Sequence, residues 1–335
     1  MLKFEFENFL AFIKHKNILI TTHDLVDIDG LASCFTLRFF LKNFLKNQDI
    51  SIYLSEVSKS TKYFIRNFKK IFPDFDFSYE KKFDPANIDI VVIVDTNSLN
   101  QIKIGDNLDI THSKFPFIFI DHHYLGPNFE NSKNESLNII NENYSSTAEI
   151  ILELFEFYNM PLTIPLKILN ISAILTDSGF FKHANNKSIQ NVSNLLCEEI
   201  KIQDIFILLK NKIDISEKIA KIKGLQRVEL IREGKYLIGI THVSSFGATV
   251  ASMLIKVGFD IGITVSKEGN QYSIHTRAKK TVCIKTGMNL GRILEEISEK
   301  YKSSGGGHDG AASMTINIES EIIIPEIIEK VKQYL

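Results

Sequence analysis

The chain has 335 residues, of which 44% are hydrophobic, and its formal net charge at pH 7 is −1. This length favours two domains, because single hydrophobic cores stop growing below it. Proteins that track long nucleic acids carry a clear excess of basic residues, so the charge balance argues against long duplex DNA or RNA as a partner. A small anionic substrate held by a few placed charges fits this composition better.

The cysteines and the N-terminal segment indicate a cellular location. Cys34, Cys197 and Cys283 lie far apart and form no metal-binding spacing. A sparse, odd number of cysteines indicates a reducing compartment. The segment MLKFEFENFLAFIKHKN is interrupted by acidic residues and has no small-residue cleavage site, so it does not resemble a signal peptide. No apolar run approaches the roughly 20 residues that cross a bilayer. We therefore expect a soluble, cytoplasmic protein with no membrane partner.

The first half of the chain alternates strand and helix patterns. Short apolar runs predict strands over residues 17–22, 49–54, 89–94, 115–120 and 137–140. Helical periodicity predicts a short packed helix at the N-terminus and helices over residues 31–45, 148–158 and 164–175. Runs that are apolar on both faces are typical of a parallel sheet covered by helices on each side. We predict a doubly wound α/β domain over residues 1–190.

The second half begins with a charged, helical segment, which we predict to be a connecting helix over residues 191–228. A second α/β pattern follows over residues 229–335, without internal repeats. Its predicted strands cover residues 236–241, 261–265, 272–276 and 314–318, and its helices cover residues 248–257 and 290–300 and the C-terminus. The expected architecture is a parallel-sheet N-terminal domain followed by a smaller α/β C-terminal domain.

Acidic and histidine side chains follow three predicted strands of the first domain. The loop after the first strand contains His23, Asp27 and Asp29; later strands end at Asp95 and at Asp121, His122 and His123; and Asp177 follows an apolar helix. Ligands collect at the carboxyl ends of strands in open α/β sheets, so we expect these side chains to meet at one edge.

The residue types at this edge suit a hard or borderline cation. Carboxylates and histidines without cysteine favour Mn²⁺, with Mg²⁺ as the alternative, over a structural Zn²⁺. Crowded carboxylates would repel one another without cations between them. Six ligands are enough for two ions, and paired ions can activate water and stabilise both oxygens at a reacting phosphate. The alternative is that each Asp is a helix cap or turn residue, as Asp29 before Gly30 suggests. Capping alone does not account for the full ordered set.

These segments, in this order, resemble the motifs of the DHH phosphoesterase superfamily. THDLVDIDG, with Ser33 after it, resembles the first motif and IVDT at Asp95 the second. IDHH at 121–123 resembles the third and LTDSGFF at Asp177 the fourth. SGGGHDGAAS resembles the glycine signature of the associated DHHA1 domain. The chain is similar to stand-alone members, which include nanoRNases, bisphosphonucleotide phosphatases and cyclic-di-AMP phosphodiesterases.

The resemblance implies a role for each residue. One Mn²⁺ would be held by His23, Asp27 and Asp95, and the other by Asp29, Asp95, His122 and Asp177, with Asp95 bridging. Asp121 would orient an imidazole, and His123 would face the scissile phosphate. The sequence departs from the pattern at Val26, where proline is usual, and at Ser313, where glycine is usual.

The second domain carries the predicted substrate-binding residues. The glycine triplet Gly305, Gly306 and Gly307 lets backbone amides approach a phosphate, and His308 can donate a hydrogen bond. We predict that these four residues form a binding loop; the alternative is a flexible linker. Arg277, at a strand end, can hold a phosphate bidentately, as the resemblance implies, or can be a solvated charge beside Lys279.

The expected function is hydrolysis of phosphodiester bonds in short RNA, in dinucleotides such as c-di-AMP and pApA, or in nucleotides. The products would be nucleoside monophosphates or a linear dinucleotide. One alternative is a family II inorganic pyrophosphatase, which TRAKK at 276–280 faintly resembles and the glycine signature argues against. Another is a catalytically inactive nucleotide sensor, which the intact ligand set disfavours. The sequence leaves open the substrate among these classes and the formation of a homodimer.

Overall fold

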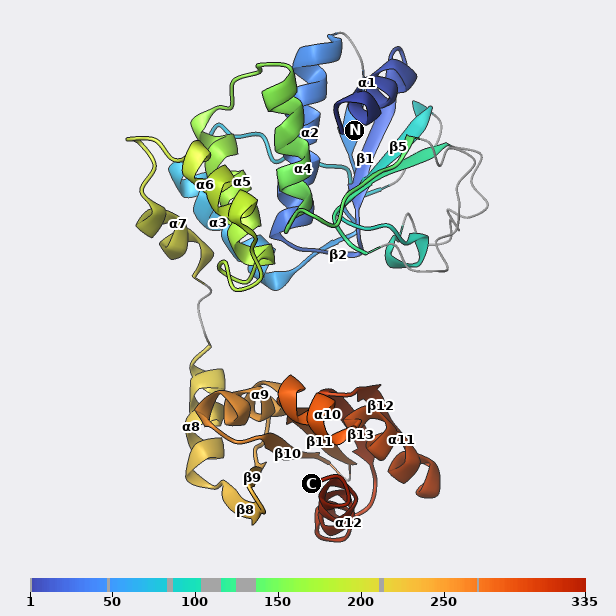
Figure 1. The fold of residues 1–335 in the computed structure, drawn as a ribbon, viewed down its shortest axis with the longest axis vertical. Coiled ribbons are helices and arrows are strands. Elements are labelled where there is room, and N and C mark those ends of the chain that lie inside the picture. The colour runs from blue at the N-terminus through green and yellow to red at the C-terminus, as the bar shows by residue number, and fades with distance from the viewer. Residues whose placement is uncertain are drawn as a thin grey trace. The chain divides into compact units, whose positions relative to one another are not determined.

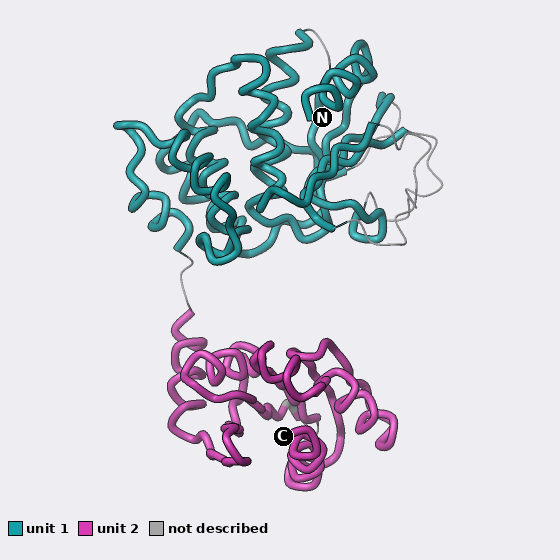
Figure 2. The backbone as a smooth tube through the Cα atoms, viewed as in Figure 1, with its two compact units in different colours: residues 1–211 teal, residues 212–335 magenta. Residues whose placement is uncertain are grey.

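The chain folds into two compact units, residues 1–211 and 212–335 (Figures 1 and 2). The computed structural model describes residues 2–46, 49–82, 87–103, 116–124, 137–210, 214–269 and 271–335. Each unit has its own sheet and its own main hydrophobic cluster. The predicted α/β class, with a parallel sheet in the first domain and a smaller second domain, is confirmed.

Unit 1 is built on a five-stranded parallel sheet with the order β3-β1-β5-β6-β7. The strands are β1 (Ile18–Thr22), β3 (Ile50–Ile52), β5 (Ile90–Val94), β6 (Phe117–Asp121) and β7 (Ile139–Ile140). Strand β3 pairs with one edge of β1, and β5 pairs with the other edge, followed by β6 and β7. The direction in which strands are added therefore reverses between β1 and β5. Open α/β sheets bind ligands at such a reversal, beyond the carboxyl ends of the strands.

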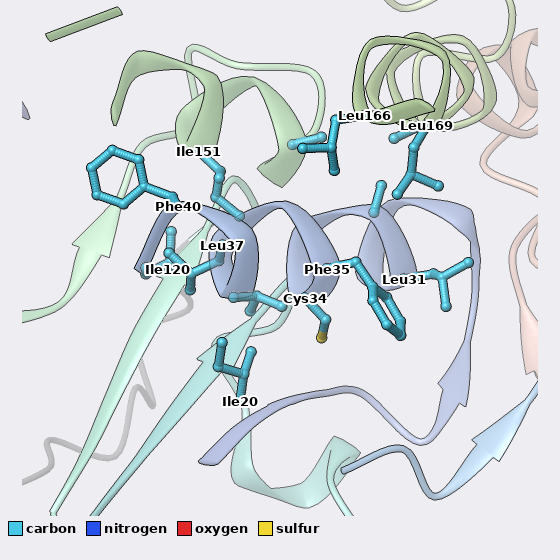
Figure 3. Close-up of a cluster of buried hydrophobic side chains, with 14 of the residues drawn as sticks. Ile20, Leu31, Cys34, Phe35, Leu37, Phe40, Ile120, Ile151, Leu166 and Leu169 are labelled. Carbon is cyan, nitrogen blue, oxygen red and sulfur yellow. The ribbon is translucent and has the colours of Figure 1, made fainter. Parts of the chain in front are cut away.

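Helix α2 (Ile28–Leu45) lies at the centre of unit 1. Figure 3 shows it between Ile20 and Ile120 of the sheet on one side and the helices α4 (Thr147–Phe157) and α5 (Ile164–Asp177) on the other. Its side chains are buried around almost the whole circumference, as in a core helix. Full burial of one large apolar side chain such as Phe40 contributes about 1.5–3 kcal/mol. This packing fixes the N-terminus of α2 beside the end of β1.

The remaining elements of unit 1 surround this centre. They are α1 (Leu2–Ile13), the paired β2 (Leu25–Val26) and β4 (Glu56–Val57), α3 (Lys59–Ile71), the short 3-10 helix η2 (Leu99–Gln101), α6 (Asn186–Leu195) and α7 (Ile202–Leu209). Alternate strand residues such as Leu19 and Ile93 point away from the α2 side and form a smaller cluster. Helices were expected on both faces of the sheet. Within the described ranges, this second cluster contains only residues of strands, loops and η2.

Unit 2 contains a six-stranded mixed sheet with the order β12-β13-β11-β10-β9-β8. The strands are β8 (Glu229–Glu233), β9 (Tyr236–His242), β10 (Ile261–Glu268), β11 (Gln271–Ala278), β12 (Ser304–His308) and β13 (Ala311–Ile316). The helices are α8 (Ile215–Gln226), α9 (Gly247–Val257), α10 (Lys280–Thr286), α11 (Leu290–Lys300) and α12 (Ser320–Lys332). Strands β9 and β10 pair in parallel, and the other neighbours pair antiparallel. None of the helices in the described ranges has both the length and the apolar character of a membrane span.

The segment 191–228, expected as one connecting helix, contains the end of α6 followed by α7 and α8. Helix α6 ends where Leu196 becomes extended, and Ile200 is buried in the core of unit 1. A new helix, α8, begins after Asp214, whose side chain accepts the N–H of Ser216 at 2.7 Å. The helical pattern is therefore interrupted twice. Residues around Ile200 pack into unit 1, and Asp214 caps the start of a new helix.

Candidate metal centre

The six predicted metal ligands meet at the carboxyl ends of β1, β5 and β6. One ligand atom from each of His23, Asp27 and Asp95 lies within 4.8 Å of the others, and the same holds for a group formed by Asp29, His122 and Asp177. An overlapping group joins Asp95 to Asp121, His122 and His123. The structure thus brings together all of the first ligand set that the resemblance implies, and three of the four residues of the second. Metal binding by each of these residues stays a prediction.

Two of the carboxylates stand at the start of α2. Asp27 is the N-cap, and its Oδ1 accepts the N–H of Gly30 at 3.0 Å. Asp29 lies in the first turn of the helix, so its predicted place in the loop is wrong. The next residue must be small, because a Cβ at Gly30 would lie 2.5 Å from Thr22 Oγ1 and 3.3 Å from Asp95 Oδ2. The Asp-Ile-Asp-Gly sequence therefore places two anions at a helix N-terminus, which favours negative charge, and leaves room for a third.

Asp95 lies between the two groups. Its Oδ2 is 3.5 Å from His23 Nε2, and its Oδ1 is 3.6 Å from His122 Nε2. Its φ of +61° is in the left-handed region, which costs a residue other than glycine about 1–3 kcal/mol. Residues held in such strain cluster at functional sites. Each carboxylate oxygen of Asp95 faces a different histidine, as bridging between two ions requires.

Buried polar atoms without hydrogen-bond partners mark the same place. Within the described residues these atoms include Thr22 Oγ1, Asp121 Oδ2 and His122 Nε2. His122 Nε2 lies 3.0 Å from Asp177 Oδ2 but forms no hydrogen bond. A buried polar atom without a partner is costly, and native structures contain few of them. A cation between this nitrogen and the carboxylates would satisfy both.

Crowding of the carboxylates shifts pKa values at the site. Burial, together with the negative charges of Asp95 and Asp177, raises the pKa of Asp29 well above its usual range. Burial lowers the pKa of His23, but the neighbouring carboxylates of Asp27 and Asp95 outweigh this and raise it to about 10. Protons therefore collect on the site, and divalent cations would displace them. The residues present fit a pair of such cations.

The second histidine of the IDHH motif is oriented by its neighbour. Asp121 is fully buried at the end of β6, and its Oδ1 lies 2.8 Å from His123 Nδ1. This hydrogen bond, partly opposed by burial, raises the pKa of His123 to about 9. Asp121 therefore fixes the orientation of the His123 imidazole and leaves its Nε2 for another partner, and the catalytic role of both residues stays a prediction.

A cavity of about 350 Å³ lies over these groups. It is lined by His23, Asp24, Leu25, Asp27, Asp95, Gln101, His123 and Asp177. Within the described part of the chain, this lining contains four carboxylates and no lysine or arginine. The nearby Lys103 does not line the cavity and pairs with Asp24 at 2.8 Å. A phosphate would therefore need added cations to enter this part of the site.

One buried residue of the site was not predicted from the sequence. Thr147, the first residue of α4, donates its N–H to Asp29 Oδ2 at 2.7 Å and its hydroxyl to Asp95 Oδ1 at 3.2 Å. The sequence Ser-Ser-Thr-Ala-Glu signals a helix start, but it does not show that the cap comes from residues more than a hundred positions away.

Two of the predicted substrate-binding residues of unit 2, Arg277 and His308, share one face of its sheet. Arg277 of β11 and His308 of β12 are both register partners of Ala311 in β13, and such partners point to the same side. Among the described residues Arg277 forms no ion pair, and its Nη1 donates to the carbonyl of Thr276 at 2.9 Å. The guanidinium is therefore not neutralised by a carboxylate of its own unit.

The prediction of a loop at Gly305–His308 is wrong, because these residues form the edge strand β12. A Cβ at Gly305 would lie 2.6 Å from Ser298 Oγ of α11, and one at Gly307 would lie 2.4 Å from the carbonyl oxygen of Ala311. A Cβ at Gly306 would meet no atom within 4 Å. Two of the three glycines thus allow close packing around the strand, and Gly306 alone faces open space.

The family of the chain follows from matches to both units. Residues 17–176 match the DHH family, N-terminal domain, and residues 241–335 match the DHHA1 domain. The chain belongs to the DHH/DHHA1 family of phosphoesterases. It is a metal-dependent hydrolase that acts on phosphoesters.

Proteins with different names are similar to this chain. The chain is 28% identical over 322 residues to an uncharacterized protein of Methanocaldococcus jannaschii, covering 96% of this chain and 94% of that protein. It is 28% identical over 215 residues to a manganese-dependent inorganic pyrophosphatase of Methanothrix thermoacetophila, covering 61% and 62%. The crystal structure of an exopolyphosphatase-related protein from Bacteroides fragilis matches with a TM-score of 0.68 at 17% identity, covering 99% and 97%. These names leave the substrate of this chain open.

Proposed function

We propose that this hydrolase is a Mn²⁺-dependent phosphodiesterase acting on very short nucleic acids. Its substrates would be short RNA, dinucleotides such as pApA and c-di-AMP, or nucleotides. The observation that carries this proposal is the charge of the cavity, whose described lining has four carboxylates and no lysine or arginine. A phosphodiester carries one negative charge, whereas pyrophosphate and polyphosphate present denser charge that requires more fixed cations.

When bound, the two cations would activate a water molecule and stabilise the entering and leaving oxygens. His23, Asp27 and Asp95 would hold one cation. The other would be held by Asp29, Asp95, His122 and Asp177, and Mg²⁺ is the alternative to Mn²⁺. These assignments are supported by the two groups of ligand atoms and by the position of Asp95, whose oxygens lie 3.5 Å from His23 Nε2 and 3.6 Å from His122 Nε2.

The remaining residues of the chain would bind and orient the substrate. The Nδ1 of His123 is held by Asp121, so its Nε2 would donate to a phosphate oxygen. Arg277, which has no carboxylate partner among the described residues, would bind the distal phosphate or base of the substrate with His308. Backbone at Gly306 would approach the same group, because no neighbour covers that position.

The likeness to a manganese-dependent inorganic pyrophosphatase supports a second candidate, hydrolysis of pyrophosphate. A substrate panel with Mn²⁺ separates the two. The panel would contain pApA, c-di-AMP, RNA oligomers of a few nucleotides, a 3′,5′-bisphosphonucleotide, pyrophosphate and a short polyphosphate. The products would be resolved by chromatography. The highest kcat/KM is expected for a dinucleotide. A kcat/KM for pyrophosphate above that of every diester, with the Asp95→Ala protein inactive as the control for contamination, would overturn the phosphodiesterase proposal.

A further inference from the structure

The N-terminus of α4 is capped by a side chain from a distant part of the sequence. The N-cap residue, Ser146, makes no side-chain capping hydrogen bond. Both oxygens of Asp29 take its place, because Oδ2 accepts the N–H of Thr147 at 2.7 Å and Oδ1 accepts the N–H of Ala148 at 3.0 Å. Such charge-assisted hydrogen bonds, at the positive end of a helix dipole, hold a buried carboxylate firmly.

Thr147 links this cap to the second carboxylate of the site. The residue is fully buried, and its hydroxyl donates to Asp95 Oδ1 at 3.2 Å. Oδ1 is the oxygen on the His122 side, whereas Oδ2 lies on the His23 side. A donor to one oxygen of Asp95 restricts rotation of the carboxylate, so that one oxygen stays directed at each ligand group.

The turn that carries Thr147 is itself fixed by a buried carboxylate. Glu149 Oε2 accepts two hydrogen bonds from Ser145, one from the backbone N–H at 3.0 Å and one from the side-chain hydroxyl at 2.7 Å. The same oxygen accepts the hydroxyl of Ser188 at 3.2 Å, and Oε1 accepts the side-chain amide of Asn191 at 2.9 Å. Because Ser188 and Asn191 belong to α6, the start of α4 is tied to a second helix. These hydrogen bonds fix the backbone that carries Thr147, and so they fix the position of its hydroxyl.

We propose that Thr147 is a positioning residue of the metal centre, whose hydroxyl orients Asp95 so that its two oxygens serve the two ions. Thr147 does not contact substrate in this role, and the proposal is independent of which phosphoester the protein hydrolyses. Its hydrogen bond to Asp29 comes from the backbone and is retained in side-chain variants. A substitution at this position therefore changes the support of Asp95 alone.

The test compares Thr147→Val, which keeps the shape and removes the hydroxyl, with Thr147→Ser, which keeps the hydroxyl. Binding of Mn²⁺ to the metal-free proteins is measured by titration calorimetry, and coupling between bound ions by electron paramagnetic resonance. Loss of an outer-shell partner weakens metal binding by about 10–100-fold. Thr147→Val should show this loss for at least one ion, with weakened spin coupling between the ions. Thr147→Ser should retain both the affinity and the coupling.

A matched control is Thr241→Val, because Thr241 is equally buried but donates to the carbonyl of Gly224 in unit 2. Its Mn²⁺ binding should equal that of the unsubstituted protein. Thermal unfolding of the metal-free proteins shows whether each variant folds, and Thr147→Ala replaces Thr147→Val if the latter does not. Two Mn²⁺ ions bound to a variant without the hydroxyl with unchanged affinity and coupling would overturn the proposal. So would an equal loss in Thr147→Ser, because the methyl group would then be the determinant.

Discussion

The two units hold their charged groups in opposite ways. In unit 1, buried carboxylates are held by a helix N-terminus or lie beside histidines. Asp29 accepts the N–H of Thr147 at the start of α4, and Asp95 lies beside His23. In unit 2, Arg277 and His308 lie on one face of a sheet, Arg277 half-buried and His308 exposed. Reacting groups need fixed geometry, whereas groups that hold a distant part of a substrate tolerate some freedom. Changes in unit 1 should therefore abolish the chemistry, and changes in unit 2 should weaken binding.

The largest effect is expected from removing the cations. Excess chelator should abolish hydrolysis, Mn²⁺ should restore it, and Ca²⁺ should restore it poorly, because the donor set of carboxylates and histidines suits transition-metal ions better. Mn²⁺ should also raise the melting temperature of the metal-free protein, since it binds only the folded state. Hydrolysis that continues undiminished in excess chelator would contradict the assignment of the centre.

Asp95→Ala should have the next largest effect. Both ligand groups lose an oxygen, so kcat should fall on the order of 10³-fold, the scale of losing a preorganised electrostatic contact in an active site. The protein should still fold, because Asp95 is a buried carboxylate whose pKa burial raises, and its removal relieves repulsion in the metal-free state. Circular dichroism and steady-state rates check the two points, with the exposed Asp74→Ala as control. A folded variant with a near-normal rate would refute the bridging role.

Arg277→Ala should act on binding more than on chemistry. The loss of a desolvated, charge-assisted hydrogen bond costs about 1.5–3 kcal/mol, so kcat/KM for a dinucleotide should fall about 10–100-fold. The change should appear mainly in KM, although remote binding energy also contributes to kcat. A small artificial phosphodiester, which lacks the distal phosphate and base that Arg277 would bind, should be hydrolysed at an unchanged rate. Lys280→Ala, which removes an exposed neighbouring charge, is the matched control.

Two other outcomes would contradict a substrate-binding role for Arg277 that is separate from the chemistry. An equal loss on the dinucleotide and on the small diester would place Arg277 at the reacting phosphate. No loss on either would leave Arg277 as a solvated surface charge, and the substrate-binding role of its sheet face would fall with it.

The sequence predicts which side chains lie together at the sheet edge, because apolar strands end where their polar residues begin. The end of a strand can be recognised from the residues around it. The positions of Asp95 and His122 at strand ends can therefore be predicted without knowing any long-range contact. The alternative of simple capping is also correct in part, since Asp27 caps α2 and Asp29 caps α4 while both belong to ligand groups. The contacts of Thr147 could not be predicted, because its partners Asp29 and Asp95 are 118 and 52 residues away and no pattern encodes such contacts.

The second unit shows where sequence patterns mislead. A strand is normally revealed by alternating side chains, and three glycines carry none, so β12 reads as a loop. The two departures from the family pattern both lie in strands. Val26, in place of proline, is fully buried and pairs with β4. Ser313, in place of glycine, lies in β13 between its register partners Gly306 and His275.

The smallest expected effect separates the glycines of β12 by their surroundings. Gly306 and Gly307 have φ values of +153° and +148°, where an alanine costs about 1–3 kcal/mol. Gly306→Ala should lose only this amount of unfolding free energy, because its Cβ meets open space. Gly307→Ala should lose more, since its Cβ would also lie 2.4 Å from the carbonyl oxygen of Ala311, and backbone cannot move aside as a flexible side chain can. Denaturant unfolding of the two variants measures the difference, and Mn²⁺ affinity should be unchanged in both because all six predicted ligands lie in unit 1. Equal destabilisation would show that β12 shifts freely, and a strand that shifts freely could not hold His308 in register with Arg277.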